Sequence, residues 1–437
     1  MLETLRNAFK VKDVRKRLMY TLAMLVVIRL GCQLPVPGVD REYLTNWFAS
    51  QTGDAFNFFS AFTGGSFEQM SIFALNITPY ITSSIIMQLL TIAIPALEEM
   101  HKDGEEGRKK IAAITRYVTV GLALMESLAM TVGFGRGGLI PDMNFLKGVT
   151  VVASMTAGSA FLMWVGEQIT EHGVGNGISI VLVINILSRI PSDLASLYDT
   201  FIKGNTLAKG VLAAVIILAV IAVTIVLVIM LSDATRRIPV QYAKKMQGRK
   251  MVGGQSTFIP LKVNTAGVIP VIFASSLLSI PQMIASFMKV SADGIGGKII
   301  AVLSQNNWFN PSRPVYSIGV ILYILMIIGF AYFYTSITFN PIEVADNMKK
   351  QGGFIPGIRP GKPTSDYLNK ILNYIVFIGA IGLTIVVLIP IFFNGVFGAY
   401  VSFGGTSIII IVGVVLETLK QIESQIVVRN YKGFLSE

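Results

Sequence analysis

Ten apolar runs of similar length alternate with polar segments along the 437-residue chain. A membrane-spanning helix needs about 20 consecutive, mostly apolar residues. The runs are near that length and lie at about 18–34, 70–92, 111–133, 149–167, 174–191, 207–232, 266–288, 315–339, 368–393 and 404–420. Only 14% of all residues are charged, whereas soluble proteins average about 25%. The pattern predicts an all-α integral membrane protein with ten transmembrane helices.

The stretch from Ala55 to Leu90, which includes most of the second run, is apolar but broken twice. Gly64 and Gly65 divide it into two pieces, and Pro79 interrupts the second piece. A broken helix is tolerated at membrane depth only where it is buried in protein or lines a watery cavity, so this run is expected to line a pore. Branched apolar side chains recur in it at four-residue spacing, which would place them on one helix face: Ile77, Ile81 and Ile85. The stripe fits either a dry seal or an ordinary helix packed on its neighbours.

Lysine and arginine are distributed unevenly between alternate connections. The N-terminal tail, the segments 93–116, 233–265 and 340–370, and the chain from 420 onward hold twenty-six of the 36, against nine in the opposite connections. Positively charged connections stay in the cytosol, and an even number of spans places both termini on one side. Both termini are therefore expected in the cytosol. The exception is the turn around Glu167–Asn176, which should be cytosolic and has no Lys or Arg. The basic N-terminal tail is followed by an apolar run without a small-residue cleavage site, so this first span is expected to be retained.

Five spans precede the connection near residue 200, and five follow it. Two halves with an odd number of spans have opposite orientations in the membrane, which permits an inverted pseudo-repeat, although the halves share no convincing similarity at residue level. The chain is therefore divided into an N-terminal half, 1–200, and a C-terminal half, 201–437, which ends in a tail at 421–437.

Two connections are too long to serve only as turns. In the segment 233–265, Ile238, Val240 and Tyr242 alternate with other residues and glycines break the run, which predicts strands and turns. The segment 340–370 contains KKQGGFIPGIRPGKPTSDY, whose glycines and prolines exclude a regular helix and indicate a rigid, protruding loop. The basic residues of both loops fit a docking surface, but positive-inside topology alone would also explain them.

Candidate chemistry within the chain is sparse. Cys32 is the single cysteine, and with only His101 and His172 beside it a Cys/His metal site is excluded. The glycine-rich runs 133–135 and 173–177 follow no predicted strand and lack the Lys-Ser/Thr ending of a P-loop. No serine, histidine and carboxylate set stands out. No cofactor, metal or catalytic residue is therefore expected.

Glu126 is the one carboxylate well inside a predicted span. Burying it costs on the order of a few kcal/mol, so its side chain should face the bundle interior or water. In a proton-coupled transporter this residue would be the obvious relay, but no second carboxylate lies well inside a predicted span to work with it.

Several long strings in the chain are distinctive: SIFALNITPYITSSIIMQLL (71–90), EEGRKKIAAITRY (105–117), EHGVGNGISI (171–180), RRIPVQYAKKMQGR (236–249), STFIPLKVNTAGVIPVIFASS (256–276), ADNMKKQGGFIPGIRPGKPT (345–364) and GGTSIIIIV (404–412). Together they resemble the SecY/translocon α-subunit family of protein-translocation channels. The resemblance covers essentially the whole chain and implies ten helices in two inverted halves. It also implies a re-entrant plug at about 54–67 and a lateral opening to lipid between spans 2–3 and 7–8.

The resemblance also implies roles for individual residues, by alignment of the motifs. The pore ring would consist of Ile77, Ile81, Ile178, Leu182, Ile272 and Ile410. The plug would include Phe56, Phe58, Phe59, Phe62, Gly64, Gly65 and Phe67. The lateral gate would carry Thr82, Gln88, Glu126, Ser275 and Ser276, where the family often has a neutral residue in place of Glu126. The contacts for the ribosome and for the motor ATPase SecA would be Arg236, Arg237 and Arg359.

The function that the resemblance implies is a passive protein-conducting channel, not an enzyme. It would translocate unfolded preproteins across the bacterial cytoplasmic membrane and release transmembrane segments sideways into lipid. The expected partners are the small subunits SecE and SecG, SecA, the ribosome, signal peptides, nascent chains and membrane lipids. An aliphatic ring suits this function because it offers no specific hydrogen bonds to a passing chain and gates by dewetting. A small-solute transporter using Glu126 and an intramembrane enzyme remain as alternatives.

Overall fold

The computed structural model describes residues 9–40, 63–135, 140–141, 144–203, 207–242, 245–247, 250–252, 256–288, 294–311, 313–397 and 405–433. Each of the ten predicted apolar runs overlaps a helix. These helices are α2 (Lys12–Gly31), α5 (Thr78–Ala93), α7 (Glu105–Phe134), α8 (Phe145–His172), α9 (Gly177–Phe201), α10 (Leu207–Asp233), α11 (Ile269–Met288), α13 (Ile318–Thr338), α15 (Lys362–Phe397) and α16 (Gly405–Gly433). Shorter helices lie between them: α6 (Pro95–Lys102), α12 (Ile295–Leu303) and α14 (Pro341–Lys350).

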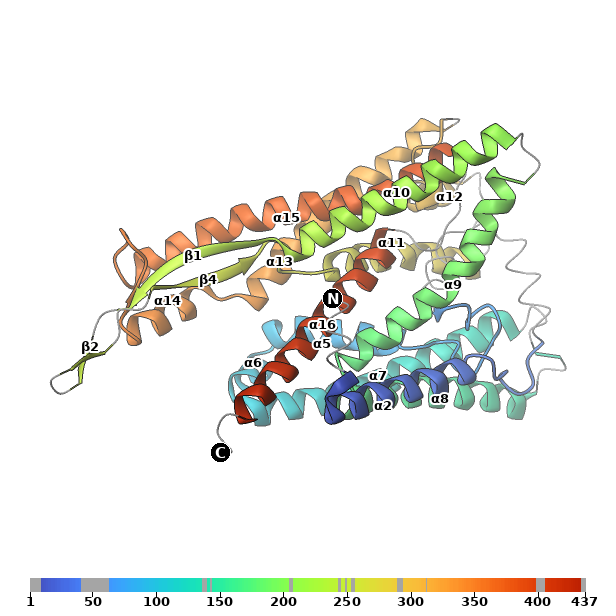
Figure 1. The fold of residues 1–437 in the computed structure, drawn as a ribbon. Helices are drawn as coiled ribbons and strands as arrows, with labels where there is room; N and C mark the ends of the chain where they lie inside the picture. Colours follow the sequence, from blue (N-terminus) through green and yellow to red (C-terminus); the bar gives the residue numbers. More distant parts are fainter. Residues whose placement is uncertain are drawn as a thin grey trace.

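Six helices among the described residues are long and apolar enough to cross a membrane, or up to seven if α5 and α6 form one bent span. The apolar part of α11, Ile269–Ser279, is shorter. The protein is therefore a multi-pass membrane protein, and the full number of ten spans stays a prediction. Figure 1 shows the strands and α14 at one end of the molecule and α12 at the other, as alternating connections require.

The start of the second run differs from the sequence-based expectation. The helix α5 begins only at Thr78, with Pro79 in its first turn, where proline is well tolerated because the missing N–H would have no helical partner. The preceding residues form turns, and Met70 and Asn76 have positive φ angles of 42° and 52°. The expected helix from residue 70 and the interruption at Pro79 were therefore wrong. The sharp break lies instead at the other end, where α5 and α6 meet at 105°.

The two long connections fold into one unit. The strand β1 (Thr235–Tyr242) pairs antiparallel with β4 (Ser256–Lys262) on one side and with β5 (Gly353–Phe354) on the other. The strands β2 (Lys245–Gln247) and β3 (Lys250–Val252) form a separate hairpin at the tip. This confirms the strands expected in the first connection. In the second, α14 precedes the Gly/Pro-rich stretch, a helix that the sequence pattern did not predict.

A small core beneath this unit joins both connections to α15. Its buried members are Ile238, Val240, Leu261, Met348, Ile355, Leu368 and Ile375. Ile238 and Val240 point inward from alternate positions of β1 while their neighbours are exposed, as the pleat of a strand covered on one face requires. The loop unit, defined here as β1–β5 and α14 together with the turns between β5 and α15, is therefore a packed structure and not a pair of free loops.

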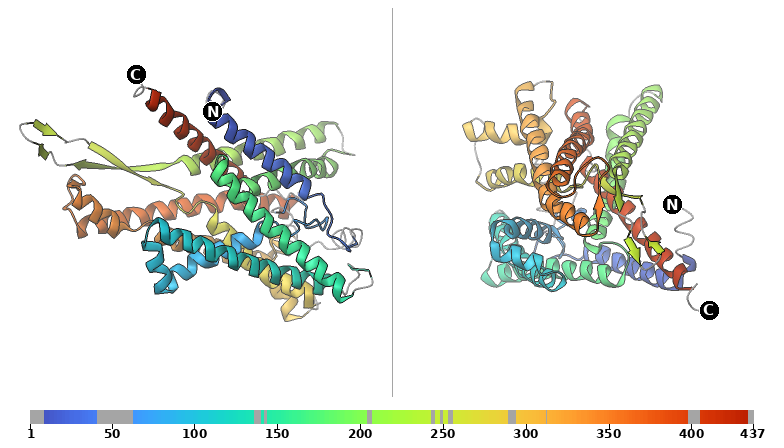
Figure 2. Two further views of the ribbon diagram at one scale, coloured as in Figure 1. Left: turned by 90° about the horizontal axis from the view of Figure 1, so that it is seen from below. Right: turned by 90° about the vertical axis from the view of Figure 1, so that its left-hand side faces the viewer.

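The remaining helices pack in two groups that α16 connects (Figure 2). In the first, α7 packs on α5 and α8, and α8 packs on α9. In the second, α13 packs on α11 and α15, and α15 packs on α10. The helix α16 contacts α10 and α15 of the second group and α9 and α2 of the first. Close approach also occurs within the first group, because a Cβ at Gly158 of α8 would overlap the carbonyl oxygen of Ile72.

Candidate functional site

The six residues assigned to the pore ring come from four separate helical elements and lie in one aliphatic cluster. Ile77, Leu182 and Ile410 belong to its buried part and are 1%, 8% and 2% exposed. The half-buried ones packed against it are Ile81, Ile178 and Ile272. Ile77 lies just before α5, while Leu182, Ile272 and Ile410 lie on α9, α11 and α16. The cluster therefore joins the helices of both groups.

The same cluster holds residues that sequence reasoning missed. Ile186 lies one turn beyond Leu182 on α9 and is 2% exposed, and Ile28 of α2 is fully buried. Phe73, in the turns before α5, also belongs to it. Every one of these side chains lacks a hydrogen-bonding group. A constriction lined by such side chains excludes water and ions when no polypeptide fills it.

Only the end of the expected plug lies within the described residues. Phe56, Phe58, Phe59 and Phe62 lie outside them. Gly64 and Gly65 have φ angles of +63° and +82°, which side chains other than hydrogen rarely permit. Phe67 is 7% exposed and packs in another core, with Met70 and Met155. The glycine pair is therefore a sharp turn fixed against the helix group.

An ion pair lies next to this turn. Arg189 Nη1 of α9 and Glu68 Oε1 are 3.0 Å apart, and their side chains are 19% and 34% exposed. Such a pair is better shielded from water than a surface salt bridge. It ties the chain just after the glycine turn to α9.

The residues assigned to the lateral gate lie on two helix pairs, and the boundary between these pairs is called the seam here. On one side α5 packs on α7, and on the other α11 packs on α13; extensive packing between the two pairs is absent in the described part of the chain. Thr82 and Gln88 of α5, Glu126 of α7 and Ser276 of α11 are half-buried. Ser275 differs, because its Oγ lies 3.0 Å from the Tyr323 hydroxyl of α13.

The hydrogen bonds of the polar side chains near the seam differ from one residue to the next. The Ser275 hydroxyl is directed within its own helix pair, so the structure places it away from the opposite side. Glu126 makes no hydrogen bond or ion pair with any described residue. Sequence reasoning missed Ser83, whose hydroxyl bonds with Thr119 and joins α5 to α7.

The three arginines assigned to docking belong to the loop unit. Arg236 and Arg237 are exposed on β1, and Arg359 is exposed in the turns that follow β5. The Arg237 guanidinium lies 4.9 Å from the centre of the Phe258 ring on β4, a cation–π contact that orients it. Folding thus brings basic side chains from two distant segments into one projecting unit (Figure 1).

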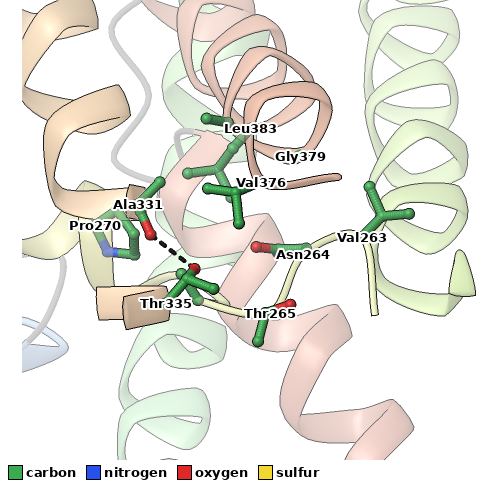
Figure 3. Close-up of a pocket in the computed structure, with 11 residues that line it drawn as sticks. Val263, Asn264, Thr265, Pro270, Ala331, Thr335, Val376, Gly379 and Leu383 are labelled. Atoms are coloured by element: carbon green, nitrogen blue, oxygen red, sulfur yellow. Dashed lines mark hydrogen bonds between the residues drawn. The ribbon is translucent and has the colours of Figure 1, made fainter. Parts of the chain in front are cut away.

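A small pocket lies at the base of this unit. It lies between the residues 263–266, α13 and α15 and has a volume of about 10 Å³ (Figure 3). Thr335 lines it and donates its hydroxyl to the carbonyl of Ala331 at 2.7 Å. A single water needs about 10–15 Å³, so the pocket admits no larger substrate. No group of three or more potential metal ligands occurs among the described residues.

Comparisons with known proteins agree with this architecture. The SecY family model matches residues 71–419. Over 100% of both chains, the protein is 47% identical to the protein translocase subunit SecY of Streptomyces galbus and 46% identical to that of Halalkalibacterium halodurans.

Solved structures share the fold at low sequence identity. A structure described as a protein-conducting channel matches with a TM-score of 0.66 at 19% identity, covering 94% of this chain and 92% of that one. A study of the plug domain of SecY gives 0.64 at 20% identity with the same coverage. Sec61 from a canine ribosome–channel complex gives 0.62 at 18% identity, again over 94% and 92%.

Proposed function

The chain belongs to the SecY family, and from that premise we propose that it is the channel-forming subunit of a protein translocase. It conducts unfolded preproteins across the cytoplasmic membrane of a bacterium and releases transmembrane segments sideways into lipid. The observation that carries the proposal is the aliphatic cluster, in which side chains from α5, α9, α11 and α16 converge. The relatives that match the whole chain are protein translocase subunits.

The cluster supplies the resting seal. Ile77, Leu182 and Ile410 form its buried part, and Ile81, Ile178 and Ile272 complete the ring. A passing polypeptide displaces these side chains without meeting a hydrogen-bond partner that would hold it. When the chain has passed, the aliphatic groups close again and the space dewets.

The seam between α5–α7 and α11–α13 serves as the lateral gate. Opening there breaks few contacts, because the two pairs do not pack extensively on each other in the described part of the chain. Thr82, Gln88, Glu126 and Ser276 offer polar groups along the seam, and Ser275 supports it from behind through Tyr323. The plug, at about 54–67, closes the resting pore.

Energy and targeting come from partners, since the chain itself carries no sequence motif for nucleotide binding. SecE and SecG are proposed as small membrane subunits, SecA as the motor ATPase, and the ribosome as the partner during co-translational insertion. Signal peptides and nascent chains are the polypeptides that these partners deliver. Arg236, Arg237 and Arg359 dock these partners, because guanidinium groups bind phosphate and carboxylate in a bidentate manner. The channel itself is passive.

A small-solute transporter would use Glu126 differently. A transporter places polar groups at the midplane between its halves, whereas here aliphatic side chains meet where the two helix groups join. Glu126, without a charged partner among the described residues, fits a polar gate element better than one member of a proton relay.

Both termini and the loop unit face the cytosol in this proposal. Single cysteines at Lys250 and Lys362, and at Asn306 for the opposite side, test it in a Cys32→Ser background. An impermeant thiol reagent added to intact cells should label only the Asn306 position. Labelling of either loop position from outside would overturn the orientation.

The function itself is tested by purifying the protein with its small subunits and reconstituting it in vesicles. With SecA, ATP and a preprotein present, the preprotein should become protected from added protease. Protection should require both ATP and the channel. A reconstituted, correctly oriented channel that never protects a preprotein would contradict the proposal.

A further inference from the structure

A pair of buried amide side chains lies between the aliphatic cluster and the glycine turn, and the proposed function so far assigns it no role. Asn76 is 1% exposed and Asn185 is 0% exposed. Asn185 Nδ2 donates to Asn76 Oδ1 at 3.0 Å. This bond joins the residue just before Ile77 to the middle of α9.

Asn76 also bonds to three other groups. Its Oδ1 accepts from the backbone N–H of Ile77 at 2.7 Å, and its Nδ2 donates to the Thr63 carbonyl at 3.3 Å. Its own carbonyl accepts from Ser159 Oγ of α8 at 2.9 Å. With φ at +52°, its backbone lies in the left-handed region, which asparagine enters more readily than most residues. Asn76 thus links the glycine turn, the start of α5, α8 and α9.

The glycine turn fits closely against the same part of α9. A Cβ at Gly64 would lie 2.8 Å from the Asn185 carbonyl oxygen and 2.9 Å from Ser188 Oγ. The Ser188 hydroxyl donates to the Asn185 carbonyl at 2.6 Å and accepts from Arg29 Nη1 of α2 at 3.1 Å. Polar groups on one stretch of α9 therefore hold the turn and the asparagine pair together.

We propose that the Asn76–Asn185 pair is a latch that holds the segment 63–77 on α9 and sets how often the resting channel opens. This inference rests on the proposed channel function. Asn76 is a positioning residue, because it acts through Thr63 and Ile77 and not by touching the translocated chain. Moving either of them away from α9 requires breaking bonds made by the pair.

The latch has the modest strength that a gate requires. Asn185 Oδ1 has no hydrogen-bond partner among the described residues, so the pair does not use its full bonding capacity. A fully satisfied buried network would instead fix the segment rigidly. The pair can therefore break and re-form as the channel opens and closes.

The variant Asn76→Gly removes the side chain and keeps the backbone conformation accessible, because glycine adopts positive φ without steric cost. One net hydrogen bond shifts an equilibrium by about two- to twelvefold, and two or more are lost. We expect openings of the resting channel in planar bilayers to become at least about fivefold more frequent. Asn185→Ala should act similarly, and the double variant should exceed the larger single effect by less than about twofold, because the partners share one interaction.

A matched control and a local readout separate a latch from general destabilisation. Asn144→Ala removes a carboxamide that accepts from the Phe145 N–H at the exposed start of α8, and it should stay as silent as the wild type. In Asn76→Gly, hydrogen exchange should accelerate at the backbone amides of 63–77 while α15 stays protected.

Preprotein translocation in the same vesicles distinguishes failure of the latch from failure of the channel. If the wild type translocates while Asn76→Gly keeps both wild-type silence and wild-type exchange, the latch is wrong and the channel function stands. If the increase in opening frequency of the double variant equals the product of the two single-variant increases, the two side chains act independently and the pairing is wrong. If the wild type itself does not translocate, the channel function fails, and the exchange at 63–77 alone decides whether the pair holds the segment.

Discussion

Replacing Ile410 by asparagine should open the resting channel. Ile410 is 2% exposed among Ile77, Leu182 and other aliphatic groups. Fully burying an isoleucine side chain is worth about 1.5–3 kcal/mol, and an amide left there without a partner costs about 1–3 kcal/mol more. Both contributions destabilise the closed state, whereas the amide is hydrated in an open one. Since about 2.8 kcal/mol is a hundredfold change in an equilibrium, open channels should become at least about tenfold more frequent.

Single-channel recording of the reconstituted complex in planar bilayers measures this effect. The wild type should be nearly silent, and Ile410→Asn should show frequent ion conductance. Ile410→Leu is the matched control, because it keeps the volume and adds no polar group, and it should stay silent. Deleting the segment 56–67 should also raise conductance. If Ile410→Asn and the deletion are both as silent as the wild type while inserted in the bilayer, the cluster is not the seal.

Three further substitutions test other parts of the account. The charge of a docking arginine is reversed in Arg236→Glu, Arg237→Glu and Arg359→Glu. Each variant should weaken ribosome binding or SecA-driven translocation at least several-fold while membrane insertion stays normal. Unchanged ribosome binding and translocation in all three variants would refute the docking role. Glu126→Gln should keep translocation or ease opening, because the burial penalty disappears with the charge; loss of translocation in an assembled complex would instead show that the charge is required. Gly158→Ala should lower the thermal unfolding midpoint, because its Cβ has no space against the backbone of the segment before α5; an unchanged midpoint would contradict that close approach.

Long patterns in the chain predicted much of the fold. Each apolar run overlaps a helix, because a run of about 20 apolar residues satisfies its backbone in lipid only as a helix. The alternation of Ile238 and Val240 predicted β1, because one face of that strand covers a core. The third strand of that sheet, β5, is two residues long, too short for an alternating pattern to be seen.

Local patterns did not predict how the second run begins. Pro79 can either break a helix or start one, and the choice depends on the residues before it. Here Asn76 bonds to Asn185, 109 positions away in the chain, and to Ser159, and these contacts hold the turns that precede α5. A pairing over such a distance leaves no periodic signal in the sequence.

The spacing of Ile77 and Ile81 indicated part of the candidate site, and the rest was predicted only by resemblance. No pattern in the sequence connects Ile410 with Leu182, because each lies in a helix with many other aliphatic residues. Their convergence with Ile77 in one cluster depends on how α16 packs against α9. The structure brings the six assigned ring residues together, and their role as a seal stays a prediction.

The path of a translocating polypeptide tests the central claim most directly. A photo-crosslinking residue would replace Leu182 or Ile410 in the channel. The comparison position is Leu218 on α10, which is 66% exposed. Crosslinks to a preprotein arrested during SecA-driven translocation would then be measured. The arrested chain should crosslink at positions 182 and 410 and not at 218. Crosslinking at 218 with none at 182 or 410 would show that polypeptides do not pass through the aliphatic cluster.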